Sequence, residues 1–260
     1  IDLSNCQKKT IDYENVRYLY AQNFNFLKTE KDEIFLFIGK SKNYHENIKE
    51  AKFVRHKIAK NFNIKHNNKI KFNIDYKNQV LNIFQEDSYG RAIIFGDKII
   101  DWNINFFGSE IDEQIPAKRN YKNLTGCLTF VDIKFINVNL FAENTKCEDA
   151  INLIRTKGDI DKIEIQNNLY DGLDMDFSSL LINNIIINNA KNDCADLSFG
   201  EYKILEAKLT KCGDKGVSVG EKSNAFFKNI AISQSNIGIA SKDSSFVEIS
   251  NSNIYSTKIC

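Results

Sequence analysis

The sequence predicts an all-β protein whose second half forms a parallel β-helix with coils of 22 residues. Three observations support this class. Residues of one kind recur every 22 positions, apolar and polar side chains alternate with the period of two that is typical of a strand, and each unit holds short strand-like segments without a helical stretch. Such a unit buries its apolar face only by stacking on its neighbours, which is the physical basis of a solenoid.

The repeat is clearest at the start of each unit. Asp149, Asp171, Asp193 and Lys215 are spaced by 22, and Ile237 continues the series. Each is followed by a small residue and then by an apolar column of Ile151, Leu173, Ala195, Val217 and Ile239. Because one coil returns each position to the same edge, residues of a column should stack at about 4.8 Å. A leucine-rich repeat, the alternative, requires a Leu-x-x-Leu-x-Leu pattern and a helical limb, and the sequence shows neither.

The second strands of successive units read KIEIQNN, NIIINNA, EAKLTKC, NIAISQS and NSNIYST. The fourth unit slips by one residue and recovers before Ile237, which predicts a bulge or a longer corner near Asn224. The abundance of Ile and Asn suits such coils, with Ile in the interior and Asn ladders at the corners.

Residues 1–107 have a different pattern and are predicted to be a mixed α+β region that caps the solenoid of residues 108–260. An amphipathic helix is expected from about Glu46 to Asn61, flanked by strands such as EIFLFIG and KIKFNIDY. The region should cover the first coil, since an exposed first rung would be an edge prone to aggregation. Early coils are expected around residues 92–107 and 127–140, with the linking segment between Phe107 and Leu124.

Composition limits the classes of partner. With 35 basic and 34 acidic residues the formal charge is +1, so no strong field favours nucleic acid. No apolar run reaches the length of a membrane-spanning helix. The six cysteines form no C-x-x-C pair, which argues against a zinc ribbon. All three histidines precede the repeat, so a Ser-His-Asp triad within the coils is not expected.

The corner motifs YDGLDMD, KNDCADLS, GDKGVSVGE and IGIASKD resemble those of the polygalacturonase family of glycoside hydrolases. The resemblance covers residues 168–243, and it implies a right-handed β-helix of the pectin-lyase-like superfamily. Asp171 matches the Asp of the family's first motif and Asp193 the second Asp of its acidic pair. Asn192 stands in place of the first Asp of that pair, Lys215 replaces a His, Ala240 replaces an Arg, and Lys242 keeps a Lys.

The resemblance also implies a disulfide between Cys194 and Cys212, and with it a secreted, periplasmic or cell-surface location. Packed free thiols are the alternative for these residues. No signal peptide is recognisable in the given chain.

Two chemistries fit the altered motif. In a hydrolase, Asp171 and Asp193 would divide the acid and base roles, or Asp214 beside Lys215 would replace the missing acid, because Asn192 cannot supply a proton. In a lyase or epimerase, Lys215 would be the base, and Ca²⁺ held by Asp149, Asp171 and Asp193 would neutralise a uronate carboxylate. Asn192, Asp214, Lys242 and Tyr170 are the candidate substrate-binding residues. Neither chemistry requires a cofactor, and Ca²⁺ enters only in the lyase or epimerase mechanism.

The sequence therefore predicts a protein that processes an extracellular, acidic polysaccharide with Asp171, Asp193 and Lys215. The alternative is a non-catalytic β-helix that binds glycan or serves in a surface assembly, in which the Asp column only makes hydrogen bonds at the corners. The acids Asp174, Asp176 and Asp196 lie past the corner, and we expect them on a solvated polar face.

Overall fold

The computed structural model describes residues 7–9, 26–28, 34–38, 53–109 and 124–260, and every regular element among them is a β-strand. The chain divides into two compact units, residues 1–51 with 120–124 and residues 52–119 with 125–260. In the first unit, β1 (Gln7–Lys9), β3 (Ile34–Ile38) and β2 (Phe26–Lys28) pair in that order as an antiparallel sheet. The second unit is a parallel β-solenoid of about eight turns.

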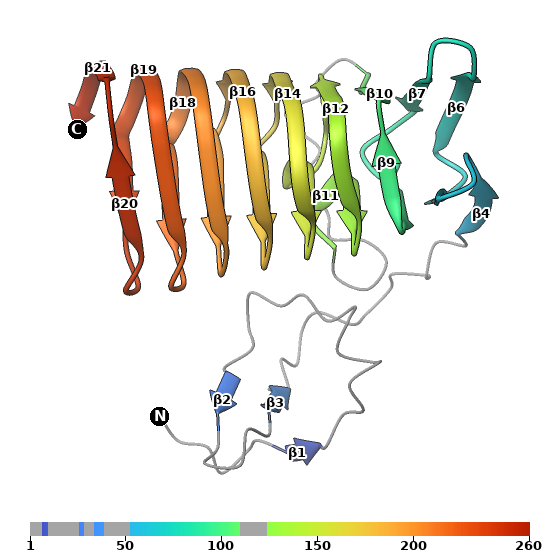
Figure 1. Cartoon of the computed structure of the whole chain (residues 1–260), viewed down its shortest axis with the longest axis horizontal. Helices are drawn as coiled ribbons and strands as arrows, with labels where there is room; N and C mark the ends of the chain where they lie inside the picture. Colours follow the sequence, from blue (N-terminus) through green and yellow to red (C-terminus); the bar gives the residue numbers. More distant parts are fainter. Residues whose placement is uncertain (1–6, 10–25, 29–33, 39–52, 110–123) are drawn as a thin grey trace. The chain divides into compact units, whose positions relative to one another are not determined.

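The solenoid begins with antiparallel strands that cover its first coil (Figure 1). β4 (Val54–Lys57) pairs with β5 (Phe62–His66), and β5 pairs with β8 (Ala92–Gly96), both antiparallel. β6 (Ile70–Asp75) lies antiparallel to β7 (Val80–Gln85). Reversing the strand direction in this way ends the stacking without an open parallel rung.

The helix expected over residues 46–61 is wrong over its described part, because β4 occupies residues 54–57 and residues 46–52 lie outside the described residues. The apolar spacing was misleading. Ile58 and Phe62 are buried from a turn and a strand, where pairing between β4, β5 and β8 satisfies the backbone.

Parallel pairing starts before residue 108. β7 pairs in parallel with β10 (Asn103–Phe107), which in turn pairs with β12 (Lys134–Glu143). β9 (Lys98–Ile100) also pairs with β12, and β8 pairs with β11 (Gly126–Val131). The strands of residues 92–107 are therefore early coils of the solenoid.

The coils from β13 to β17 alternate a short strand and a long one, and in β18 and β19 the long strand continues directly into the short strand of the next coil (Figure 1). Their strands are β13 (Asp149–Ile154), β14 (Lys157–Asn168), β15 (Asp171–Asp176), β16 (Ser179–Ala190), β17 (Ala195–Ser198), β18 (Glu201–Gly220), β19 (Asn224–Ser241), β20 (Phe246–Ile249) and β21 (Ser252–Ile259). Asp149 pairs with Asp171, and Ala195 with Val217, so the register of 22 is confirmed. Between β18 and β19 the register widens, with Glu201 opposite Asn224, and returns at Lys215 opposite Ile237, as the slip near Asn224 predicts.

The core consists of the apolar columns. Leu173 and Met175 on β15 are fully buried, as are Ile151 and Leu153 one coil earlier. Ile163, Ile165, Ile185 and Ile187 fill the interior from the long strands. Burial of each such side chain contributes about 2 kcal/mol, so the stacked columns are the main source of stability.

Two corner columns place non-glycine residues in the left-handed backbone region. Asp132, Arg155, Phe177, Phe199, Glu221 and Asp243 form one column, and Asn144, Asn167, Asn189, Lys211, Gln234 and Ser256 form the other. Asn enters this region more readily than most residues, and Asn189 donates to Asn167 across the coils at 2.9 Å. One of the two columns therefore contains a short Asn ladder of the kind that the sequence predicts.

Two disulfides each close one coil, since they join the start of a coil to its end. Cys194–Cys212, implied by the family resemblance, has a sequence separation of 18, and Cys127–Cys147, which sequence reasoning missed, has a separation of 20. The sequence signal that could have revealed the Cys127–Cys147 pair is its separation, which is close to the 22 residues of one coil. Cys260 is a free, exposed cysteine.

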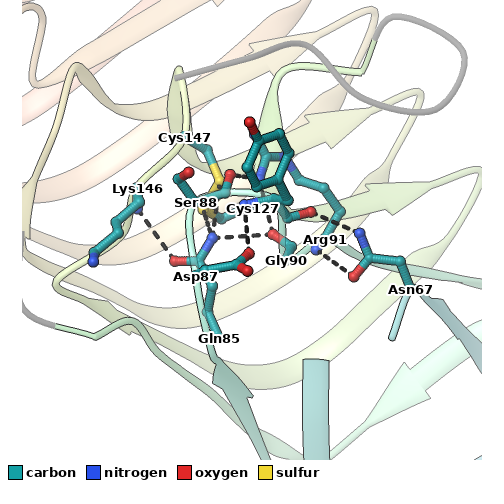
Figure 2. The surroundings of a disulfide bond; sticks show 10 residues. Asn67, Gln85, Asp87, Ser88, Gly90, Arg91, Cys127, Lys146 and Cys147 are labelled. Carbon is teal, nitrogen blue, oxygen red and sulfur yellow. Dashed lines mark hydrogen bonds between the residues drawn. A yellow bond between two sulfur atoms is a disulfide. The ribbon is translucent and has the colours of Figure 1, made fainter. Parts of the chain in front are cut away.

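The buried side chain of Gln85 lies against the Cys127–Cys147 disulfide (Figure 2). Gln85 Nε2 lies 3.2 Å from Cys127 Sγ and 3.4 Å from Cys147 Sγ, and it donates to the Gly90 carbonyl at 3.0 Å. Arg91, also buried, donates to the carbonyls of Ser88 and Gly90. Burial lowers the pKa of Arg91 to about 10 against the opposing charge of Asp149, so its guanidinium stays charged at neutral pH.

Candidate functional site

Asp171, Asp193 and Lys215 lie at one corner on three successive coils. The Asp193 amide donates to Asp171 Oδ1 at 2.8 Å, and the Lys215 amide donates to Asp193 Oδ1 at 2.9 Å. Each carboxyl group therefore bonds the backbone of the next coil, and the three side chains follow one line along the solenoid. The structure brings together the residues that the 22-residue spacing predicts.

Asp171 has the environment of a carboxyl group that titrates near neutrality. Burial raises its pKa to about 7, against hydrogen bonds from the Asp193 amide and from Asn192, whose Nδ2 donates to Asp171 Oδ1 at 2.7 Å. The charge of Asp193 raises the pKa further. Asn192 thus positions Asp171, and Tyr170, which precedes it, is exposed at the same corner.

Lys215 joins two carboxylates. Its Nζ lies 3.3 Å from both oxygens of Asp193 and also bonds Asp214 Oδ2. Burial alone would lower the pKa of Lys215, but its bond to Asp214 and the charge of Asp193 raise it. Lys215 is therefore an ammonium ion here, and it would have to release a proton, which both ion pairs oppose, before it could act as a base.

Asp193 is more buried than Asp171 and Lys215, with a side-chain exposure of 6%. Burial raises its pKa above the ordinary value, and the amide and ammonium groups of Lys215 offset only part of that rise. The ion pair with Lys215 stabilises the charged form of Asp193, and Asp171 has no such ion pair. Two neighbouring carboxyl groups with different partners can hold different protonation states.

Asp149 continues the line in the opposite direction and is buried. Burial raises its pKa well above the ordinary value, and the charge of Asp171 adds to this effect. Among the residues that the structure describes, no three His, Cys, Asp or Glu side chains converge as a metal site. Calcium binding by Asp149, Asp171 and Asp193 stays a prediction.

The expectation of a solvated face for Asp174 and Asp176 is wrong, because both side chains are buried. Asn152 Nδ2 donates to Asp174 at 2.9 Å and to Asp176 at 3.1 Å. Burial raises the pKa of Asp174 well above the ordinary value, and the charge of Asp176 raises it further. Alternation along a strand shows which side chains leave the core, and it does not show whether they reach water.

Asp196 is a functional candidate that sequence reasoning placed on the solvated face. Burial raises its pKa, the charge of Lys242 lowers it, and that of Asp193 raises it. Lys242, exposed just beyond the end of β19, is thus near enough for its charge to act on Asp196. The signal was the column Asn152, Asp174, Asp196 and Ser218, which is polar in four successive coils before Ala240 follows in the fifth.

Comparison with protein families, with curated proteins and with solved structures finds no match. The fold alone defines the class, a parallel β-helix with a line of carboxyl groups along one corner. None of the described residues form a helix long and apolar enough to cross a membrane.

Proposed function

We propose that this protein processes an acidic extracellular polysaccharide, with Asp171 as proton donor and Asp193 as the charged carboxylate. The observation that carries the proposal is the unequal environment of two neighbouring carboxyl groups. Burial places the pKa of Asp171 near 7, whereas Asp193 is paired with Lys215. Glycoside hydrolysis uses one carboxylic acid and one carboxylate that flank the scissile bond, about 5 to 9.5 Å apart.

The resemblance of the corner motifs to polygalacturonases supports the substrate class, and the two disulfides support an oxidising, extracellular location. The ion pairs of Lys215 favour hydrolysis over the lyase reaction, since the lyase needs Lys215 as a neutral base. Lys215 with Asp214, and Lys242 with Asp196, would then bind substrate hydroxyl and carboxylate groups.

A second candidate function is glycan binding without turnover. Its support is that Asp171 Oδ1 and Asp193 Oδ1 both accept backbone amides of the next coil, a role that needs no chemistry. In this case the column stabilises the corner, and the exposed Tyr170 and Lys242 contact the glycan.

Turnover assays on a panel of acidic and neutral polysaccharides separate these functions. New reducing ends without unsaturated products indicate hydrolysis, unsaturated uronic acid products indicate a lyase, and binding without either indicates the second candidate. Asp171→Asn and Asp193→Asn should each lower hydrolysis by at least about a hundredfold. Asp159→Asn, an exposed acid on β14, is the matched control. Full activity in both site variants, with unchanged circular dichroism, would refute the assignment.

A further inference from the structure

The β4–β5 hairpin carries three cations on one face of the antiparallel cap. Arg55 and Lys65 lie directly opposite each other across the two strands, and Lys57 lies opposite Asn63 on the same face. Arg55 and Lys57 are exposed and Lys65 is partly exposed. We call Arg55, Lys57 and Lys65 the cap patch.

The cap patch lacks the acidic partners that other cations of this cap have. Lys69 pairs with Asp87 at 3.0 Å, and Lys71 pairs with Glu86. Among the described residues no carboxylate forms an ion pair with a cap-patch residue. Like charges directly opposite on paired strands repel, so the hairpin keeps an arrangement that an anion between them would stabilise.

The ring of Phe95 on β8 holds the two opposed cations in place. The guanidinium carbon of Arg55 lies 5.1 Å from the ring centroid, and Lys65 Nζ lies 5.2 Å from it. Asn63 accepts hydrogen bonds from Arg55 Nε and Nη2 at 3.3 and 3.1 Å. The two charged groups therefore lie against the same ring, and Arg55 stays exposed while Lys65 is partly exposed.

We infer that the cap patch binds the carboxylate or sulfate groups of an acidic glycan, away from the Asp171 corner. Arg55 supplies a planar donor group and Lys65 a second charge, which suit such an anion. Nucleic acid fits less well, because it requires a longer basic stripe and free aromatic faces for base stacking, and the cations occupy Phe95. The choice of an acidic glycan rests on the proposed function.

The test measures affinity for fluorescent polygalacturonate, hyaluronan and heparin, with dextran as the neutral control. Arg55→Gln combined with Lys65→Gln should weaken binding of an acidic glycan roughly tenfold at low salt. Lys208→Gln combined with Lys228→Gln removes the same charge from exposed positions elsewhere and should leave affinity unchanged. The difference between wild type and the cap variant should shrink at roughly 0.5 M salt.

Equal affinity of the cap variant and the wild type, or no binding of any acidic glycan, would overturn the inference. Binding of a single-stranded oligonucleotide as tightly, with the same loss in the cap variant, would overturn the choice of glycan. Turnover is measured in parallel on the same samples. Loss of binding in the cap variant without any turnover by the wild type would refute the proposed hydrolysis and leave the cap patch supported.

Discussion

Removing the Cys194–Cys212 disulfide should cost about 3 kcal/mol of the free energy of unfolding. The bridge closes a ring with a sequence separation of 18, and in the chain-entropy treatment a ring of this size restricts the unfolded chain by that amount. The Cys194→Ala/Cys212→Ala double variant avoids leaving an unpaired thiol. Urea unfolding, followed by circular dichroism and Tyr fluorescence together, gives the free energy if the two transitions coincide.

The same treatment predicts a nearly equal loss for Cys127→Ala/Cys147→Ala, whose separation is 20. The two losses should differ by less than about 0.2 kcal/mol from ring size alone. Cys260→Ala is the control, because its thiol is free and exposed. An unchanged urea midpoint in either double variant would refute the reasoning, as would free thiols at these positions in the unreduced protein.

Three further perturbations test the corner and the core. Burial raises the pKa of Asp171 from 3.8 to about 7, so between these pH values the folded state keeps a proton that the unfolded state has lost, and stability falls as the pH rises. Asp171→Asn should therefore gain up to about 4 kcal/mol relative to wild type between pH 4 and pH 8, and parallel pH profiles would contradict this. Asp243→Gly should raise the free energy of unfolding by up to about 1 kcal/mol, because Asp243 has φ of 54°, and a loss would show that the corner is unstrained. The buried Tyr202 hydroxyl shares its one hydrogen between the carbonyls of Met175 and Ser198, which lie 2.8 and 2.9 Å away, so Tyr202→Phe should lower the melting temperature through a loss of about 1–3 kcal/mol, and an unchanged value would argue against this hydrogen bond.

The solenoid could be predicted from the sequence because its order is one-dimensional. Once Asp149, Asp171 and Asp193 share a register, the neighbours of every other residue in those coils follow without further information. The slip before Asn224 was visible for the same reason, since it shifts one column against another.

The cap could not be predicted in this way. Residues 54–75 do not repeat, and Phe53, Ile58 and Phe62 fit both a helix and a turn between strands. The choice depends on the free edge of β8, which lies about thirty residues further along the chain. Burial of Asp174 and Asp176 was also missed, because period-two alternation describes direction and carries no information on what covers a face.

The two closed coils also determine how the protein would respond to a pulling force. A chain stretched from its ends lengthens by about 3.4 Å for each residue released, but residues inside an intact ring cannot be drawn out. The rings hold back separations of 20 and 18 residues, which corresponds to roughly 130 Å of contour length. Single-molecule extension curves recorded with and without reductant should therefore differ by that length. The redox state of the solution would thus determine how far the stretched chain can extend.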